Sequence, residues 1–273
     1  MSLELSLTQK PDVPLEADVI SPDVMAGLSN KAISALEVFH GNEKATIGDF
    51  FAVKGDGTGD GAEKIILKGD LSKVKHIGTN MSRGRISIRG NAGLHLGAYM
   101  SGGEITVAKN AGDWVGPEMT GGRIIVKGNA GHLIGSAYRG SQTGILGGEI
   151  FIHGNVGNEA GNTMKNGLIV IGGNCGDFAG VNMKAGTIIV LGHLGQRCGA
   201  GMRRGSIVSM NEAELPPTFT YACDYNPSFL RVYLRRLREE GFKIDETQIT
   251  GRYKRWSGDS IEMNRGEVLM LAS

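Results

Sequence analysis

Apolar and polar positions repeat with a nearly constant step between Met81 and Met210. Each row of the repeat holds an apolar–variable–apolar triplet, such as Ile86-Ser87-Ile88, and a second short apolar segment that ends in glycine. The rows begin at Met81, Met100, Met119, Ile145, Met164, Met183 and Met202. The step is 19 residues except after Met119, where it is 26 because Ser136–Gly144 carries seven extra residues. A short and regular step is typical of a solenoid.

The triplet has the period of a strand with one buried face, and 19 residues leave no room for a helix with its connections. Glycine stands at the fourth place of every row and at the thirteenth and seventeenth places of every complete row. Such glycines suit tight corners that demand positive φ. We therefore predict an all-β protein, a parallel β-helix in which each row is one coil. Coils spaced about 4.8 Å apart would form a rod on the order of 35 Å long.

Asparagine recurs at the eleventh place, between the triplet and the second apolar segment. The five residues of this column are Asn91, Asn110, Asn129, Asn155 and Asn174, and His193 takes the place in the sixth row. Stacked asparagines can hydrogen-bond to one another and to the backbone of neighbouring coils. We expect a structural asparagine ladder and not a binding row.

The outward places change character along the rod. The fifth place alternates in charge through Arg85, Glu104, Arg123 and Glu149, which indicates a solvated face. Further on, the outward residues are apolar, and they are Phe151, Leu168, Val170, Ile189, Leu191 and Val208. So large an apolar surface needs a cover. The cover is either the helix predicted between Asn226-Pro227 and Gly241 or a partner subunit.

Two further outward features favour contacts with partners. One is the fifteenth-place column, which contains His95, Trp114, Leu133 and Phe178. The other is the inserted loop, which carries Tyr138 and Arg139. Because Trp, Tyr and Arg commonly anchor interfaces, these six residues are our candidate subunit interface.

The segments outside the repeat are predicted to be caps. Residues 1–64 form an N-terminal cap, in which Leu3–Leu7 is an edge strand and Ser21-Pro22-Asp23 starts the first of two short helices. The glycine-rich stretch 55–61 is a polar hairpin turn, and the strand at Ile65 lies two residues out of step with the later rows. Residues 65–213 form the β-helix, and residues 214–273 add a helix and a strand that pack on it.

Composition narrows the possible functions. A net charge of +1 gives no general attraction to nucleic acid or to a membrane, and the chain has neither a membrane-spanning apolar run nor a secretory leader, so we expect a cytoplasmic protein. The three cysteines and six histidines form no metal-binding spacing, and Cys175 and Cys198 are expected to be buried thiols. We predict no catalytic residue, cofactor or metal in this chain. The rival hypothesis is an enzyme whose groove is lined by His132, Arg139, His153 and Glu159.

The rows resemble the GXGXG domain that the glutamate synthase large subunit shares with the C subunit of formylmethanofuran dehydrogenase. The flanking segments favour the formylmethanofuran dehydrogenase family. These segments are Pro14–Asp18, Phe39–Asn42, Gly48–Phe51, Leu215–Phe219, Pro227–Leu230 and the pattern Tyr253-x-Arg255-x-x-Gly258-Asp259. The resemblance covers nearly the whole chain.

This resemblance implies a right-handed β-helix that carries no cofactor and holds catalytic subunits together. The implied partners are amidohydrolase-like, pterin-dehydrogenase-like and formyltransferase-like subunits of a complex in one-carbon metabolism. The parent complex would be either a molybdenum or tungsten formylmethanofuran dehydrogenase or the related bacterial formyltransferase/hydrolase complex, which we favour. A glutamate-synthase-like structural module is the remaining alternative.

Overall fold

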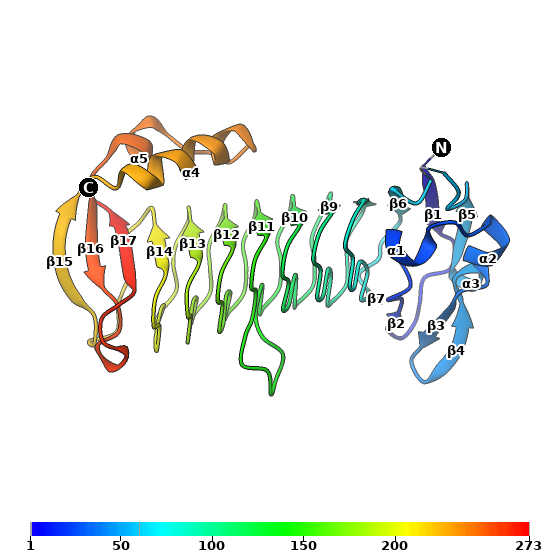
Figure 1. Ribbon diagram of the computed structural model, residues 1–273, viewed down its shortest axis with the longest axis horizontal. Helices are drawn as coiled ribbons and strands as arrows, with labels where there is room; N and C mark the ends of the chain where they lie inside the picture. Colours follow the sequence, from blue (N-terminus) through cyan, green and yellow to red (C-terminus); the bar gives the residue numbers. More distant parts are fainter. Residues whose placement is uncertain (1, 60, 273) are drawn as a thin grey trace.

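A computed structural model describes residues 2–59 and 61–272, so Met1, Asp60 and Ser273, which fall within the expected caps, lie outside the described residues. The row strands are β8 (Arg85–Arg89), β9 (Glu104–Val107), β10 (Arg123–Val126), β11 (Glu149–Ile152), β12 (Leu168–Ile171), β13 (Thr187–Val190) and β14 (Ser206–Ser209). They lie side by side along the long axis of the molecule (Figure 1).

The remaining elements lie toward the two ends of this stack, and a C-terminal helix also lies along the outer side of the last rows (Figure 1). The N-terminal elements are β1 (Leu3–Leu7), β2 (Leu15–Glu16), α1 (Pro22–Met25), α2 (Asn30–Ser34), β3 (Glu37–His40), β4 (Glu43–Thr46), α3 (Ile47–Phe50), β5 (Phe51–Lys54), β6 (Lys64–Lys68) and β7 (Val74–Lys75). The C-terminal elements are β15 (Thr220–Tyr225), α4 (Ser228–Glu239), α5 (Glu246–Thr250), β16 (Tyr253–Ser257), the 3₁₀ turn η1 (Ser260–Glu262) and β17 (Glu267–Leu271).

One mostly parallel sheet dominates the molecule. Its 13 strands follow the order β15-β16-β17-β14-β13-β12-β11-β10-β9-β8-β6-β1-β5, and a second sheet has the order β4-β3-β2-β7. With few and short helices beside these sheets, the prediction of an all-β protein is confirmed.

Every row strand pairs with the same places of the next row. Ile86 is opposite Ile105, and Ile105 is opposite Ile124. The register is kept across the longer step, since Ile124 is opposite Ile150 and the seven extra residues project as a loop between β10 and β11 (Figure 1). Strand β6 lies two residues out of step with the later rows, as predicted, because its Ile65 pairs with Ile86.

The core is a column of aliphatic side chains inside the stacked rows. The sixth and eighth places, such as Ile105 and Val107, are fully buried, and so are the methionines at the first place. Full burial of such a side chain contributes roughly 1.5–3 kcal/mol, so the repeated column is the main source of stability.

The apolar outer face of the late rows is covered by the chain itself. Leu230, Leu234 and Leu237 of α4 are buried against Phe151 and its neighbours in the following rows. Helix α4 begins after Pro227 and ends before Gly241, which adopts φ +90°. Of the two covers considered for this face, the C-terminal helix is therefore the correct one.

Two expectations for the N-terminal cap are wrong. Strand β1 is not an edge strand, because β6 pairs with it in parallel on one side and β5 pairs antiparallel on the other. The stretch 55–61 is not a hairpin turn for the same reason: it connects β5 to β6 across β1 instead of joining paired neighbours. The two short helices are present, with Ser21 and Ser29 as N-caps whose side chains accept backbone N–H groups.

None of the helices in the described residues is both long and apolar enough to cross a bilayer.

Candidate subunit interface

The fifteenth-place column lies at a corner where the backbone is left-handed. His95, Trp114, Leu133 and Phe178 have φ between 60° and 63°. Positive φ is unusual for bulky residues. It persists here because each N–H at the corner donates to a carbonyl oxygen of the next row, for example from Trp114 to His132 at 2.9 Å. The sixteenth-place residues that follow are buried, whereas the four fifteenth-place side chains are only partly buried.

An aromatic cluster forms where the inserted loop folds back on this column. We define it as His76, His95, Tyr99, Trp114 and Tyr138. The rings of His76 and His95 stack with centroids 4.6 Å apart, and Trp114 stacks on Tyr138 at 4.9 Å. The hydroxyl of Tyr138 lies 2.9 Å from Nδ1 of His95. The loop residue is thus held against the rows instead of protruding freely.

The aromatic cluster is uncharged at neutral pH. Burial lowers the pKa of His95 to about 4, and the neighbouring His76 and Lys75 contribute to the decrease. Burial also raises the pKa of Tyr138 well above its ordinary value. Neutral His95 and the Tyr138 hydroxyl share a hydrogen bond through Nδ1, in which the tautomer of the ring sets the donor. A partly buried aromatic surface with polar atoms at its edge is common in protein interfaces.

A small cavity of about 250 Å³ opens beside the aromatic cluster. Trp114, Leu133, Tyr138, Arg139 and Glu159 are among the residues that line it. Five of the six candidate interface residues therefore lie around one site, because His95 contacts Tyr138. Phe178 is the exception.

Phe178 lies apart from this site, and its ring packs under the guanidinium of Arg197 at 5.4 Å. The row between Leu133 and Phe178 has Glu159 at the fifteenth place, so a charged residue separates Phe178 from the rest of the predicted column.

Of the four residues of the rival enzyme hypothesis, Arg139 and Glu159 line the cavity described above. His132, which is not among its lining residues, accepts the backbone N–H of Asn158 at Nδ1 (2.9 Å). His153 stacks on Phe242 with centroids 4.2 Å apart. Both histidines are thus engaged in packing of the rows and of the C-terminal segment.

The asparagines of the eleventh place bond to backbone and not to one another. The Oδ1 atom of each asparagine accepts the N–H of the residue at the same place of the next row. The donors are the N–H groups of Asn110, Asn129, Asn155, Asn174 and His193, at 2.8 to 3.2 Å. Each side chain therefore satisfies a corner N–H that no strand ladder reaches.

A second ladder of the same kind stands at the fourteenth place, and the sequence pattern did not predict it. Asp113, His132, Asn158 and Asp177 each accept, through a side-chain atom, the N–H of the fourteenth-place residue of the next row at 2.8 to 3.0 Å. The signal was weak because the four acceptors are of three residue types and share the column with Leu94 and Gln196. Only the common ability of the four to accept a hydrogen bond could have revealed the ladder.

Cys175 and Cys198 are buried, as expected, and burial raises the pKa of both thiols to about 12. Within residues 2–59 and 61–272, no three His, Cys, Asp or Glu side chains come together in a way that could hold a metal ion.

Comparisons with known proteins agree on the repeat. The family model described as "GXGXG motif" matches residues 66–225. A 94-residue segment is 45% identical to the C subunit of the tungsten-containing formylmethanofuran dehydrogenase 2 of Methanothermobacter thermautotrophicus, covering 33% of this chain and 35% of that protein. An 84-residue segment is 45% identical to the C subunit of the molybdenum-containing formylmethanofuran dehydrogenase 1 of Methanosarcina barkeri, covering 30% of this chain and 28% of that protein. The aligned segment thus spans about a third of the length of these relatives.

One solved structure is similar over the whole length. It is a chain in the crystal structure of the formyltransferase/hydrolase complex (FhcABCD) from Methylorubrum extorquens in complex with methylofuran. The two chains share 31% identity and superpose with a TM-score of 0.91, covering 99% of this chain and 100% of that one.

Proposed function

The chain belongs to the family of proteins with the GXGXG motif, and from this premise we propose that it is a non-catalytic scaffold subunit of a complex in one-carbon metabolism. The complex is of the formylmethanofuran dehydrogenase or formyltransferase/hydrolase type, which converts a formyl carrier to formate or carbon dioxide. The catalytic residues and cofactors of the complex lie in companion subunits, and the complex works in the cytoplasm.

The observation that carries the proposal is the similarity over the full length to a chain of the Methylorubrum extorquens complex. A TM-score of 0.91 over 99% of this chain includes both caps, not only the repeat. The segments that pack around the rows are therefore shared as well. This similarity supports the bacterial formyltransferase/hydrolase type as the parent complex.

For the fold, we propose a single-stranded right-handed parallel β-helix. Residues 65–213 form its coils, residues 1–64 its N-terminal cap and residues 214–273 its C-terminal cover. The 19-residue step in register supports this arrangement, as do the hydrogen bonds between rows outside the strands, such as that from Ala92 to Asn110. The asparagine ladder has a structural role in it.

We propose that the aromatic cluster and the cavity beside it contact a companion subunit. The surface combines aromatic rings with Arg139, which is exposed at the edge of the cavity. The companions are amidohydrolase-like, pterin-dehydrogenase-like or formyltransferase-like proteins. Phe178 contributes to the same face at a distance from the cluster.

Native purification of the tagged chain tests the function. We expect companion subunits to co-purify, the assembly to release formate from a formylated carrier, and the chain alone to be inactive. Formyl-carrier turnover by the isolated chain would contradict the scaffold role. Co-purification with a glutaminase subunit would point instead to a glutamate-synthase-like module.

A pair of variants tests the interface. Trp114→Ala should release a companion while the chain stays folded, because Trp114 is only partly buried. Phe39→Ala is the matched control, since Phe39 is an exposed aromatic residue in the N-terminal cap. An assembly that survives Trp114→Ala unchanged would contradict the proposed contact.

A further inference from the structure

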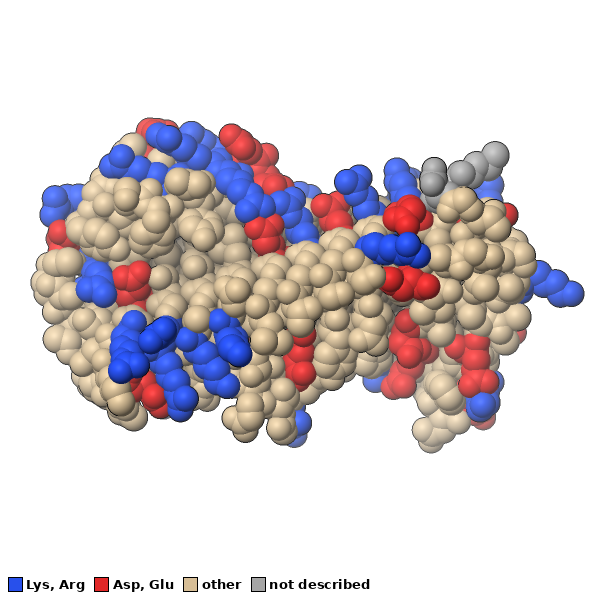
Figure 2. Space-filling model, in the orientation of Figure 1, with Lys and Arg blue, Asp and Glu red and all other residues tan. Residues whose placement is uncertain are grey.

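Basic side chains gather on the last rows, at the end of the molecule opposite the N-terminal cap. The second place of the early rows holds Ser82, Ser101 and Thr120, whereas the last three rows have Lys165, Lys184 and Arg203 there. Arg204 follows at the third place, and Arg265 comes from the turn before β17. Figure 2 shows basic side chains gathered over the last rows. At the second place, basic side chains are thus confined to the last three rows of a chain whose net charge is +1.

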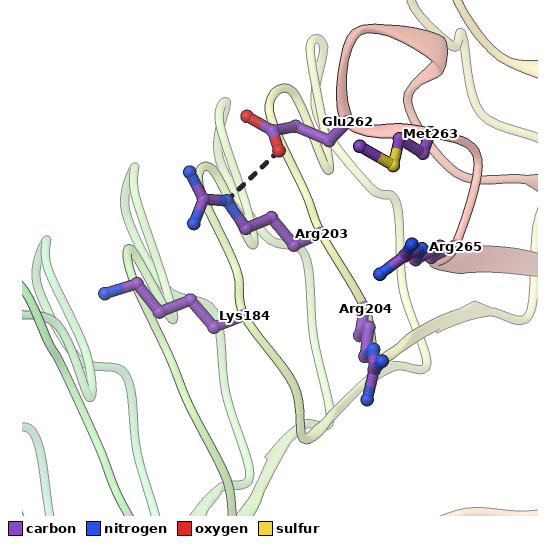
Figure 3. A pocket seen from close by; sticks show the side chains of 6 residues that line it. All are labelled: Lys184, Arg203, Arg204, Glu262, Met263 and Arg265. Carbon is purple, nitrogen blue, oxygen red and sulfur yellow. Dashed lines mark ion pairs between the residues drawn. The ribbon is translucent and has the colours of Figure 1, made fainter.

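Four of these side chains line one hollow of about 550 Å³, which we call the basic pocket. Its lining consists of Lys184, Arg203, Arg204, Glu262, Met263 and Arg265 (Figure 3). Arg203 and Lys184 come from successive rows, and Glu262, Met263 and Arg265 come from the turn between β16 and β17. The pocket thus joins the last rows to the C-terminal segment.

Charge in the basic pocket is not balanced. Glu262 is its only acid, and it pairs with Arg203 at 3.1 Å. Arg204 and Arg265 make no ion pair or side-chain hydrogen bond within the described part of the chain, and the Lys184 ammonium donates to the carbonyl oxygen of Gln142. By contrast, Arg123 on an earlier row pairs with two carboxylates. The basic pocket therefore has spare capacity for negative charge.

Hydrogen bonds anchor the turn beside the pocket. Asp259 is 3% exposed, and its carboxylate accepts the N–H groups of Gly201 (2.8 Å) and Ile261 (3.0 Å). Gly258 donates to the carbonyl oxygen of Gly266 at 2.7 Å, which closes the base of the turn. A surface held in place in this way loses little conformational freedom when it binds.

The same turn presents apolar side chains to solvent. Met263, which lines the basic pocket beside Arg204 and Arg265, is 72% exposed. Ile261 is 76% exposed and lines the neighbouring hollow. Exposed aliphatic side chains next to unpaired arginines are typical of a protein interface, in which apolar contacts supply affinity and charges supply orientation. A bare phosphate or a nucleic acid backbone would make no use of these apolar side chains.

We propose that the basic pocket and the turn beside it are a docking site for a carboxylate-rich segment of a partner protein. The carboxylates of the segment pair with Arg204, Arg265 and Lys184, and an apolar side chain packs on Met263, which lines the same pocket. This site is separate from the aromatic cluster and deepens the proposed scaffold role, on which the identity of the partner rests.

Titration of the purified full-length chain tests the chemistry of the pocket. The probe is a fluorescein-labelled peptide in which glutamate and serine alternate around a central leucine. We expect binding that weakens with salt and that falls by about tenfold or more in the double variant Arg204→Glu and Arg265→Glu. The matched control reverses two exposed charges of the early rows, Arg89→Glu and Lys109→Glu, and should bind as the unmodified chain does.

Three results would overturn the inference. One is equal loss of binding in the control variant. Another is equal binding of the peptide in which glutamine replaces glutamate, because carboxylates would then not be recognised. The third is tighter binding of a single-stranded oligonucleotide than of the peptide, which would assign the pocket to nucleic acid.

Carbodiimide coupling in the native assembly tests the partner. The reagent joins an amine to a carboxylate in contact with it, with loss of water, so Lys184 should become linked to an aspartate or glutamate of a companion. If companions co-purify and none is linked to Lys184, the inference fails and the scaffold role stands. If no companion co-purifies, the scaffold role fails, and the peptide titration alone decides whether the pocket binds acidic segments.

Discussion

The early rows, with strands β8 to β10, and the late rows, with β11 to β14, share one interior and differ on the outside. At the outward seventh place, Thr106 of an early row is partly exposed, whereas Phe151 and Val170 of late rows are fully buried under α4. The inward places of both groups hold the same aliphatic column. The interior thus builds the rod, and the outer column decides whether solvent or another element lies against each row.

A charge inside a late row gives the largest expected effect. Ile150 of β11 is fully buried, so Ile150→Asp places an unpaired carboxylate in the core and should cost on the order of 4 kcal/mol or more. Thr106→Asp on the outer face should cost about 1 kcal/mol or less. Urea unfolding followed by circular dichroism measures both. Equal losses would mean that the assignment of inside and outside is wrong.

Truncation of the covered face should come next. Phe151 packs edge-on against Phe242, and Phe151→Ala should cost about 3–4 kcal/mol because it leaves a cavity beneath the C-terminal segment. Ile125 has the same place one row earlier and is only partly buried, so Ile125→Ala should cost about 1–2 kcal/mol. A loss at Ile125 as large as at Phe151 would show that the cover extends over the early rows.

Glu149 lies at the boundary between the two groups of rows. Its carboxylate accepts two hydrogen bonds from Arg236 of α4, at 2.6 and 2.7 Å, and one from Arg123 at 3.1 Å. We expect Glu149→Gln to cost about 1–3 kcal/mol at neutral pH. Thermal unfolding of both proteins measures the difference.

Acidification should abolish the difference in stability between the unmodified protein and Glu149→Gln. Burial alone would raise the pKa of Glu149, but the hydrogen bonds and charges of Arg236 and Arg123 outweigh it and hold the pKa below 4.5. Because the folded pKa lies below the unfolded one, the ionised carboxylate stabilises the fold above the ordinary carboxylate pKa, and this contribution disappears as the pH falls through the folded pKa. A gap between the two proteins that stays constant down to acid pH would contradict the ion pair.

The smallest expected effect concerns the exposed side of the early rows. The pKa of His95 falls to about 4 on folding, so the unfolded chain takes up a proton near pH 6.5 that the folded protein does not bind. Stability should therefore decline between about pH 6.5 and pH 4, by on the order of 1 kcal/mol, because solvent at the half-buried imidazole screens most of the effect of the pKa shift. His95→Asn tolerates the positive φ and should flatten this dependence, apart from the share of His76. Melting temperatures measured across this pH range would reveal an unchanged slope if His95 were not responsible.

The interior of the rows could be predicted from the sequence because it follows a strict period. A side chain such as Ile105 recurs at the same place of each row, and the hydrophobic effect alone decides its side. The cover by α4 could be anticipated in part from the leucines at helical spacing. The ion pair that holds this helix on the rows could not be predicted, because Arg236 and Glu149 are 87 residues apart and only the folded chain brings them together.

The candidate interface was less predictable. Trp114 and its neighbours in the column could be recognised as outward residues, but their left-handed backbone could not, since bulky residues normally avoid it. Nor did the sequence indicate that Tyr138 packs back on His95, because loops carry no periodic signal. The basic pocket stayed hidden because Arg265 joins the rows only through the turn between β16 and β17.

The pairing register is kept across the 26-residue step, so successive rows lie about 4.8 Å apart along the whole stack. The two proposed contact sites are the aromatic cluster near β8 to β10 and the basic pocket beside β14. The number of rows between them sets their distance. Removal or addition of one 19-residue unit would change the distance between proteins bound at the two sites by about 4.8 Å. The distance between catalytic neighbours would then be encoded as a count of repeats.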